Sequence, residues 1–93
     1  MVVGVIVWEL EILGAQSLKD KRRVVSSLKE RLRSRFKVSA AETRHQDLWQ
    51  RAEIAVAVVG GEQYHVTDVL DSADRLVTGD MRARVISARR TYY

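Results

Sequence analysis

The sequence predicts an α+β fold, in which two helices cover one face of a four-stranded antiparallel sheet and the chain order is βαββαβ. Two segments carry apolar residues at helical spacing, and four others are rich in β-branched residues or alternate apolar with polar side chains. The 93 residues contain neither proline nor cysteine. We therefore expect one ferredoxin-like domain, residues 1–93, with a single core and with neither disulfides nor a thiolate metal site.

The first expected element is a strand over residues 2–12. Its side chains alternate between two faces, because successive residues of a strand point in opposite directions. We predict that the face with the large aromatic side chain lies in the core. That face consists of Ile6, Trp8, Leu10 and Ile12, and the opposite face begins with Val3, Val5 and Val7.

A helix is expected next, over residues 17–36. Ser17 is a typical N-cap, and Asp20 three residues later suits both a capping interaction and the helix dipole. Gly14 and the two residues after it turn the chain into this helix. A stripe at helical spacing should face the core, and it consists of Leu18, Val25, Leu28, Leu32 and Phe36.

Three further strands and a second helix complete the pattern. A short, polar strand is expected over 37–44, and after a loop an apolar strand follows over 51–59. Gly79 is placed to stop the second helix, whose apolar stripe consists of Val66, Val69, Leu70, Ala73, Leu76 and Val77. The last strand, over 81–92, carries Arg82, Arg84, Arg89 and Arg90.

The composition of the strands predicts their order in the sheet. The strands over 2–12 and 51–59 are the most apolar and should be central, whereas the two charged strands should lie at the edges. The order 4-1-3-2, with both helices on one face, satisfies this requirement and the right-handed crossover rule. The expected architecture is therefore a ferredoxin-like βαββαβ sandwich.

The face of this sheet that lacks helices should expose a contiguous apolar patch, which monomers seldom leave in water. Its expected members are Val3, Val5, Val7, Ala55, Ala57 and Val59. We therefore predict a homodimer that forms through this face. The alternative is that the C-terminal segment, which ends in Tyr92 and Tyr93, folds over the patch.

Most of the positive charge lies in the first helix. Residues 17–37 hold nine Lys or Arg against two acidic residues, a net charge of +7, whereas the whole chain has +4. Lys19, Arg22, Ser26, Lys29 and Arg33 fall on one flank about 80° wide and roughly 21 Å long. Its four basic residues are a candidate track for the phosphates of a nucleic acid. The alternative is a solvated face whose long side chains cover apolar surface.

A second, weaker candidate is an anion site at the start of the same helix, formed by Ser17, Lys19 and Lys21. The sequence offers no catalytic, cofactor-binding or metal-ligating motif. His45 and His65 lie near aspartates but near no nucleophile, and the chain contains no Asn with which to build an acylphosphatase-like site.

Base stacking on the sheet, as RNA-recognition domains of this topology perform it, is not expected. The open face has no aromatic side chain on its central strands, because Trp8 is assigned to the core. The other tryptophan, Trp49, follows Leu48 in the loop before the third strand. We expect it to close one end of the core.

Four segments resemble the YlxP-like family of small uncharacterised bacterial proteins. They are Gly4 in the first strand, SLKDKRRVV from residue 17, FKVSAAE from residue 36 and DLWQRA from residue 47. The resemblance spans nearly the whole chain and implies a ferredoxin-like fold and a bacterial cytoplasmic protein. It implies no activity and no catalytic residues, although the genes of the family often lie beside those of translation initiation and ribosome maturation factors. The Arg-rich C-terminal strand departs from the family pattern.

We therefore expect a cytoplasmic, non-catalytic binding protein whose first helix contacts RNA or a ribosomal particle, without a cofactor or metal and away from membranes. Glu9 and Glu11 interrupt the apolar N-terminal run, which predicts neither a signal peptide nor a membrane span. The alternative is a protein-interaction or small-ligand regulatory module that acts through the open sheet face or the N-terminus of the first helix.

Overall fold

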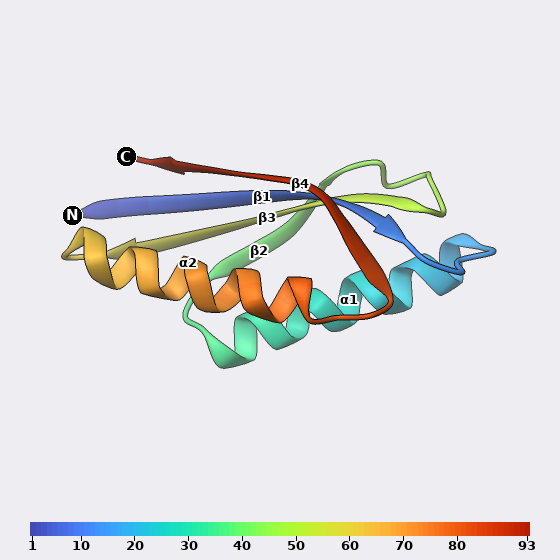
Figure 1. The fold of residues 1–93 in the computed structure, drawn as a ribbon, viewed down its shortest axis with the longest axis horizontal. Helices are drawn as coiled ribbons and strands as arrows, with labels where there is room; N and C mark the ends of the chain where they lie inside the picture. Colours follow the sequence, from blue (N-terminus) through green and yellow to red (C-terminus); the bar gives the residue numbers. More distant parts are fainter.

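A computed structural model describes residues 1–93, which form a four-stranded antiparallel sheet with two helices on one of its faces (Figure 1). The elements are β1 (Val2–Ile12), α1 (Leu18–Arg35), β2 (Ser39–Arg44), β3 (Arg51–Gly60), α2 (Gln63–Thr78) and β4 (Ala83–Tyr92). This succession confirms the predicted βαββαβ order. Figure 1 also shows that the two termini lie at the same end of the molecule.

The strands are arranged in the order β2-β3-β1-β4, and each neighbouring pair is antiparallel, which confirms the predicted 4-1-3-2 sheet. Irregularities shift the register between Glu9 and Leu10 where β1 meets β4, and between Glu42 and Arg44 where β2 meets β3. Both lie at the level where Glu9 is paired with Glu53 across β1 and β3. β-Bulges can re-aim side chains, and these irregularities lie beside a polar cluster described below.

Two strands begin later than predicted. β2 starts at Ser39 rather than at residue 37, because the N–H of Val38 bonds at 2.9 Å to the carbonyl two residues earlier, in a tight turn after α1. β4 starts at Ala83 rather than at residue 81, because the carboxylate of Asp80 accepts the N–H of Arg82 at 2.9 Å and holds the preceding turn. Side-chain and turn hydrogen bonds, which strand periodicity does not reveal, set both boundaries.

The core lies between the sheet and the two helices. The predicted inward face of β1 is confirmed, since Ile6, Trp8, Leu10 and Ile12 are each at most 1% exposed. The indole N–H of Trp8 donates to the carboxylate of Asp74 on α2 at 2.8 Å, so the polar atom of this side chain has a partner. The helices add Val24, Val25, Leu28 and Leu32 from α1, and Val66, Leu70, Ala73 and Val77 from α2.

Gly4 lets α2 approach β1 closely. A Cβ atom at this position would lie 2.4 Å from Cγ1 of Val66 and 3.0 Å from Cδ1 of Leu70. Carbon atoms do not approach this closely without displacement, so the glycine in β1 is required by packing rather than by backbone conformation.

The C-terminus does not fold over the open face of the sheet. Tyr92 continues β4 opposite Gly4, and its hydroxyl lies 3.1 Å from Oγ1 of Thr67 on α2, the helix-covered side. Tyr93 extends the pairing, since its backbone exchanges hydrogen bonds of 2.8 and 3.0 Å with Val3. The alternative in which the last residues cover the apolar patch is therefore wrong.

The open face itself carries the apolar residues that the strand parity predicted. Val3, Val5, Val7, Ala55 and Ala57 are half-buried and Val59 is exposed. Neighbouring strands bring them together, because Val5 is paired with Ala57 and Val7 with Ala55.

Neither helix has the length and apolar character that spanning a membrane requires.

Candidate nucleic-acid interface

The lysines and arginines without an ion-pair partner are concentrated in α1 and the turn after it. Seven of the 16 Lys and Arg side chains pair with a carboxylate, and nine do not. Seven of these nine lie in residues 19–37, and they are Lys19, Arg22, Arg23, Lys29, Arg33, Arg35 and Lys37. The other two are Arg75 on α2 and Arg89 on β4. The helix therefore presents positive charge that the protein does not neutralise internally.

The first turns of α1 form an open part of this basic surface. Lys19, Arg22, Arg23 and Ser26 line a shallow depression on the outside of the helix. These four side chains are exposed, because the opposite face of α1 packs on the sheet. Free cations around a depression are an arrangement that an anionic backbone can enter.

The structure places all four basic residues of the predicted track on α1, and their exposure differs. Lys19 and Arg22 are exposed, and Lys29 is half-buried. Arg33 is exposed, but its guanidinium also donates to the carbonyl of Ala40 on β2. Arg23, which is also exposed, was not part of the prediction, because at about 100° per residue it lies roughly 40° outside the flank that contains the other basic residues.

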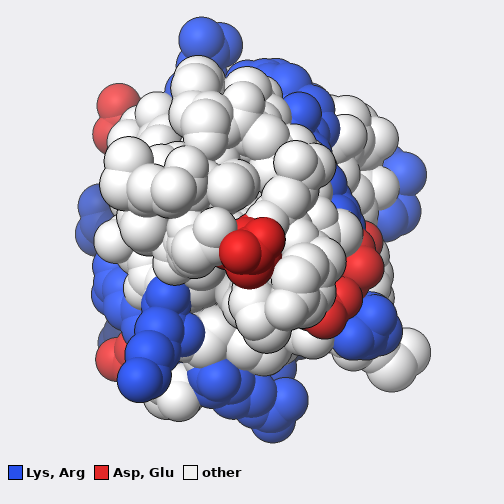
Figure 2. Space-filling view, turned by 90° about the vertical axis from the view of Figure 1, so that its left-hand side faces the viewer, with Lys and Arg blue, Asp and Glu red and all other residues white.

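The charge is also visible from the end of the molecule. Figure 2 looks at the end that holds both termini, and Lys and Arg side chains crowd its lower rim, the side on which Figure 1 places the helices. The centre of this end is mostly uncharged. Lys and Arg side chains also stand at the top and right of this view, so positive charge lies around the rim of this end and leaves its middle mostly uncharged.

The anion site predicted at the start of α1 does not form as expected. The hydroxyl of Ser17 accepts the N–H of Asp20 at 3.1 Å, and the Asp20 carboxylate accepts the N–H of Gln16 at 3.1 Å. These reciprocal bonds confirm the predicted N-cap and place a negative charge where the anion would bind. Of the three predicted residues, Lys19 remains exposed and unpaired.

Lys21 is buried rather than available to an anion. Its side chain is 1% exposed, and its ammonium lies 2.7 Å from the carboxylate of Glu42 on β2. It also donates to the carbonyl of His45 in the loop that follows. The lysine therefore ties the first turns of α1 to β2 and to the start of the β2–β3 loop.

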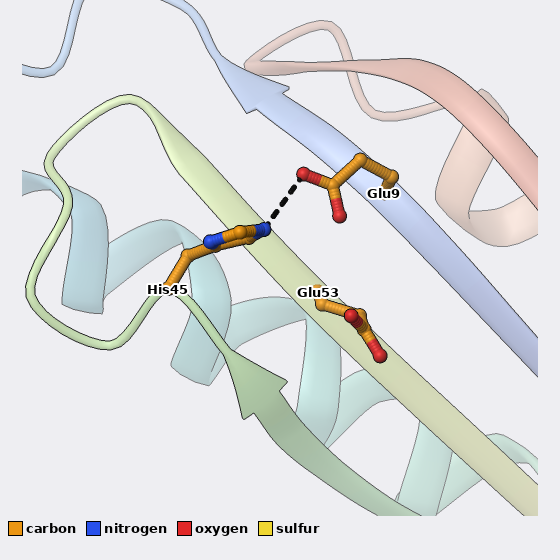
Figure 3. A group of neighbouring side chains, drawn as sticks. All are labelled: Glu9, His45 and Glu53. Carbon is orange, nitrogen blue, oxygen red and sulfur yellow. Dashed lines mark ion pairs between the residues drawn. The ribbon is translucent and has the colours of Figure 1, made fainter.

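Glu9, His45 and Glu53 form a polar cluster that sequence spacing did not predict. The two glutamates are cross-strand neighbours on the open face of the sheet, and ligand-type atoms of all three residues lie within 4.8 Å of one another. Figure 3 shows the imidazole reaching from the β2–β3 loop toward Glu9, where Nε2 and Oε1 are 3.0 Å apart. Strand register brings these residues together, and register could not be read from the sequence.

Both glutamates of this cluster already have cationic partners. The guanidinium of Arg51 contacts Oε1 of Glu9 at 2.5 and 3.1 Å, and Nε of Arg44 lies 3.5 Å from Oε2 of Glu53. These arginines offset the repulsion of two carboxylates that face each other across strands. A metal ion would have to displace them, so the arrangement fits a structural anchor for the loop better than a metal centre.

The β2–β3 loop exposes an aromatic side chain, contrary to prediction. Trp49 is 52% exposed and Leu48 is 48% exposed, so Trp49 does not close the core. With Asp47, Gln50 and Arg51 they line an open hollow of about 450 Å³. His45, at φ 65°, has a left-handed backbone conformation that turns the chain into this loop.

Comparisons with known proteins identify relatives without an assigned role. A family model described as "Protein of unknown function (DUF503)" matches residues 3–90. The uncharacterized protein YlxP of Bacillus subtilis (strain 168) is 36% identical over 61 residues, and the aligned part covers 66% of this chain and 66% of that protein. The match thus spans just under two thirds of the relative's length.

One solved structure supports the architecture. The de novo designed protein LFR1 1, whose solution NMR structure has a ferredoxin fold, covers 100% of this chain and 83% of its own, with a TM-score of 0.59 and 13% sequence identity. At this identity the likeness shows the ferredoxin-like fold alone.

Proposed function

The chain belongs to the DUF503 family of proteins of unknown function, and we propose that it is a non-catalytic RNA-binding protein that holds a phosphate backbone against α1. The observation that carries the proposal is the set of seven Lys and Arg side chains in residues 19–37 that have no carboxylate partner. Binding of phosphates by such side chains releases counterions from the nucleic acid, which supplies most of the affinity in sequence-independent complexes.

The geometry of α1 suits a strand of nucleic acid better than a single phosphate. The exposed cations from Lys19 to Arg33 extend along roughly 21 Å of helix, at about 1.5 Å per residue. This length reaches several consecutive phosphates. RNA is the nucleic acid that we favour, because the genes of the YlxP-like family, which the sequence resembles, often lie beside genes of translation factors. We accordingly propose that the protein acts in the bacterial cytoplasm.

A charge-matched pair of double variants tests the proposal. Arg22→Gln with Arg23→Gln removes two unpaired cations from α1, and Arg75→Gln with Arg89→Gln removes two unpaired cations from elsewhere. Both variants lose the same net charge. We expect the α1 variant to weaken binding of structured RNA by at least tenfold in a filter-binding or anisotropy assay at low salt, and the other variant to bind nearly as wild type.

Two outcomes would overturn the proposal of RNA binding through α1. If wild type binds no RNA at low salt, or if the two double variants lose affinity equally, the helix has no special role. Equal losses would indicate a response to net charge alone, which any basic surface gives.

A second candidate function is self-association through the open sheet face, and we propose it as compatible with RNA binding through α1. A shallow hollow of about 200 Å³ on this face is lined almost entirely by small apolar side chains, including Val5, Ala41, Ala55 and Ala57. The part of this face around Val5 is apolar, and the ion pairs of Glu9 and Glu11 lie farther along β1. An apolar patch of this kind is suited to packing against its own copy about a two-fold axis.

Substitution at the centre of this face tests the homodimer. Val5→Lys would place two like charges near the symmetry axis, so light scattering should show a dimer for wild type and a monomer for the variant. Lys19→Gln, on the opposite side of the molecule, is the control. A wild-type monomer at high micromolar concentration, or an unchanged mass for Val5→Lys, would contradict the dimer.

A further inference from the structure

We infer that Trp49 stacks on an unpaired base of the RNA whose backbone lies along α1, an inference that rests on the proposed function. The ligand class is therefore RNA with single-stranded nucleotides next to a helix, rather than a continuous duplex. Trp49 is the one aromatic side chain in the β2–β3 loop, and half of its surface is exposed. Exposed aromatic rings beside cationic tracks are the usual means by which proteins hold unpaired bases.

The loop that carries Trp49 is fastened to the start of α1 at both of its ends. At one end, the carbonyl of His45 accepts a hydrogen bond from the buried ammonium of Lys21. At the other end, the side-chain amide of Gln50 donates to the carbonyl of Ala15 at 3.3 Å, two residues before the N-cap of α1. Figure 1 shows this loop and the beginning of α1 at the same end of the molecule.

The loop is also fixed to the sheet, so the indole is presented on a rigid support. The imidazole of His45 contacts Glu9 at 3.0 Å, and the N–H of Leu48 bonds to the carbonyl of His45 at 3.0 Å in a turn. The N–H of Ile12 donates to the carbonyl of Gln50 at 2.9 Å. A ring held in this way loses little conformational freedom when it binds.

The hollow beside Trp49 has the size and chemistry for a base rather than a phosphate. The hollow is open and about 450 Å³ in volume, which leaves room for a flat base beside the indole. The indole and Leu48 offer apolar surface for stacking. The carboxylate of Asp47 has no cationic partner and would repel a phosphate, and the guanidinium of Arg51 is already held by Glu9. Phosphates are therefore directed to α1 and a neutral base to the hollow.

Tryptophan fluorescence gives a direct readout, because the chain has two tryptophans and one of them is fully buried. Trp8 is 0% exposed and supplies a constant background, so quenching by RNA reports on Trp49. The probes are an RNA hairpin with a five-nucleotide single-stranded tail and the same hairpin with a blunt end. We expect quenching and tighter binding with the tailed hairpin, and little quenching with the blunt one.

Two substitutions separate stacking from a structural role. Trp49→Ala should weaken binding of the tailed hairpin by about 5- to 100-fold and leave binding of the blunt hairpin unchanged. Trp49→Phe should retain most of the affinity, since it keeps an aromatic ring. A hairpin whose tail has the same length but contains abasic sites keeps every phosphate and tests the inference without altering the protein. Wild type should bind this RNA as weakly as Trp49→Ala binds the hairpin with the normal tail.

The outcomes distinguish this inference from the proposed function. If RNA binding depends on Arg22 and Arg23 but the tail, the abasic sites and Trp49→Ala have no effect, the stacking inference fails and the backbone interface stands. If no RNA binds at low salt, both fail. If the tryptophan emission shifts to the blue with vesicles of anionic phospholipid and is unchanged with RNA, Trp49 is a membrane-inserting residue and the inference is overturned.

Discussion

Single charged residues join helix α1 to other parts of the fold. Lys21 joins α1 to Glu42 on β2, and Asp80 joins the α2–β4 turn to α1 through Arg31, whose guanidinium lies 2.5 Å from the carboxylate. Arg82 bonds to the same carboxylate at 2.7 Å. Charges buried in this way cost desolvation energy, and they are stable because each has a partner.

We expect Lys21→Met to lower the free energy of unfolding by about 3 kcal/mol, because it leaves the half-buried carboxylate of Glu42 without a cation. Urea denaturation followed by circular dichroism measures the change. Lys19→Met, on the exposed side of the same helix, is the matched control and should change the stability by less than about 0.5 kcal/mol.

Adding Glu42→Leu to Lys21→Met should recover much of the loss, because neither partner then remains as an unpaired charge. An equal loss for Lys19→Met and Lys21→Met would show that the ion pair of Lys21 with Glu42 contributes nothing to stability.

Asp80 should make the stability of the fold depend on acid pH. Hydrogen bonds from the side chain of Arg82 are the main cause that lowers the pKa of Asp80, burial opposes them, and Arg31 adds to the lowering. A carboxyl whose pKa is lower in the folded than in the unfolded state stabilises the fold above the unfolded pKa. That stabilisation disappears as the pH falls through the folded pKa.

The corresponding prediction concerns Asp80→Asn. At neutral pH the variant should be less stable than wild type by about 2 kcal/mol, and the difference should shrink as the pH falls below about 4. Urea melts between pH 7 and pH 2 measure it. Asp68→Asn, at an exposed position of α2 without an ion pair, is the control. A difference that does not change with pH would mean that Asp80 acts through its shape and not its charge.

Some of these residue-level features had a signal in the sequence. Lys21 lies at helical spacing between Leu18 and Val25, within the apolar stripe of α1, and this spacing is a signal of burial. The prediction of an anion site at Lys21 did not use this signal. The meeting of Glu9 with His45 and Glu53 had no such signal. It depends on the register of β1 against β3 and on a loop with a left-handed residue.

At the scale of elements, periodicity predicted the helices and strands, and their order followed from composition. Alternation assigned the inner and outer faces of β1 correctly because one of its faces is fully buried, which fixes the register of a strand. The first residues of β2 and β4 were misplaced, because local hydrogen bonds of the turns decide them. Trp49 was misassigned because its loop has no periodicity from which burial could be inferred.

The docking of α2 on β1 depends on Gly4, and we expect Gly4→Ala to be destabilising by about 1–3 kcal/mol. The added methyl group would lie only 2.4 Å from Cγ1 of Val66. The cost of relieving this clash exceeds the small stabilisation that replacing a glycine brings by restricting the unfolded chain. Gly61→Ala is the control, because nothing lies within 4 Å of a Cβ there and its stability should be unchanged or slightly higher. Thermal or urea melts in which the two variants are equally stable would show that α2 does not pack on β1 as described.

At the scale of the whole molecule, positive charge and apolar surface are separated. The unpaired cations gather on α1, and the open sheet face is apolar around Val5. Glu9 and Glu53, farther along the central strands β1 and β3, are matched by arginines. This separation would allow the protein to pair through the sheet while α1 remains free for RNA. The sequence indicated the charged helix and the apolar strands, whereas the exposure of Trp49 became evident from the structure alone.

The central claim is that phosphates bind to α1, and the salt dependence of RNA affinity tests it most directly. Each lost phosphate contact lowers the slope of log affinity against log salt by roughly 0.7–0.9. For a structured RNA, Arg22→Gln with Arg23→Gln should therefore reduce the slope by about 1.4–1.8, whereas Arg75→Gln with Arg89→Gln should leave it close to the wild-type value. Identical slopes for the two double variants would contradict the claim.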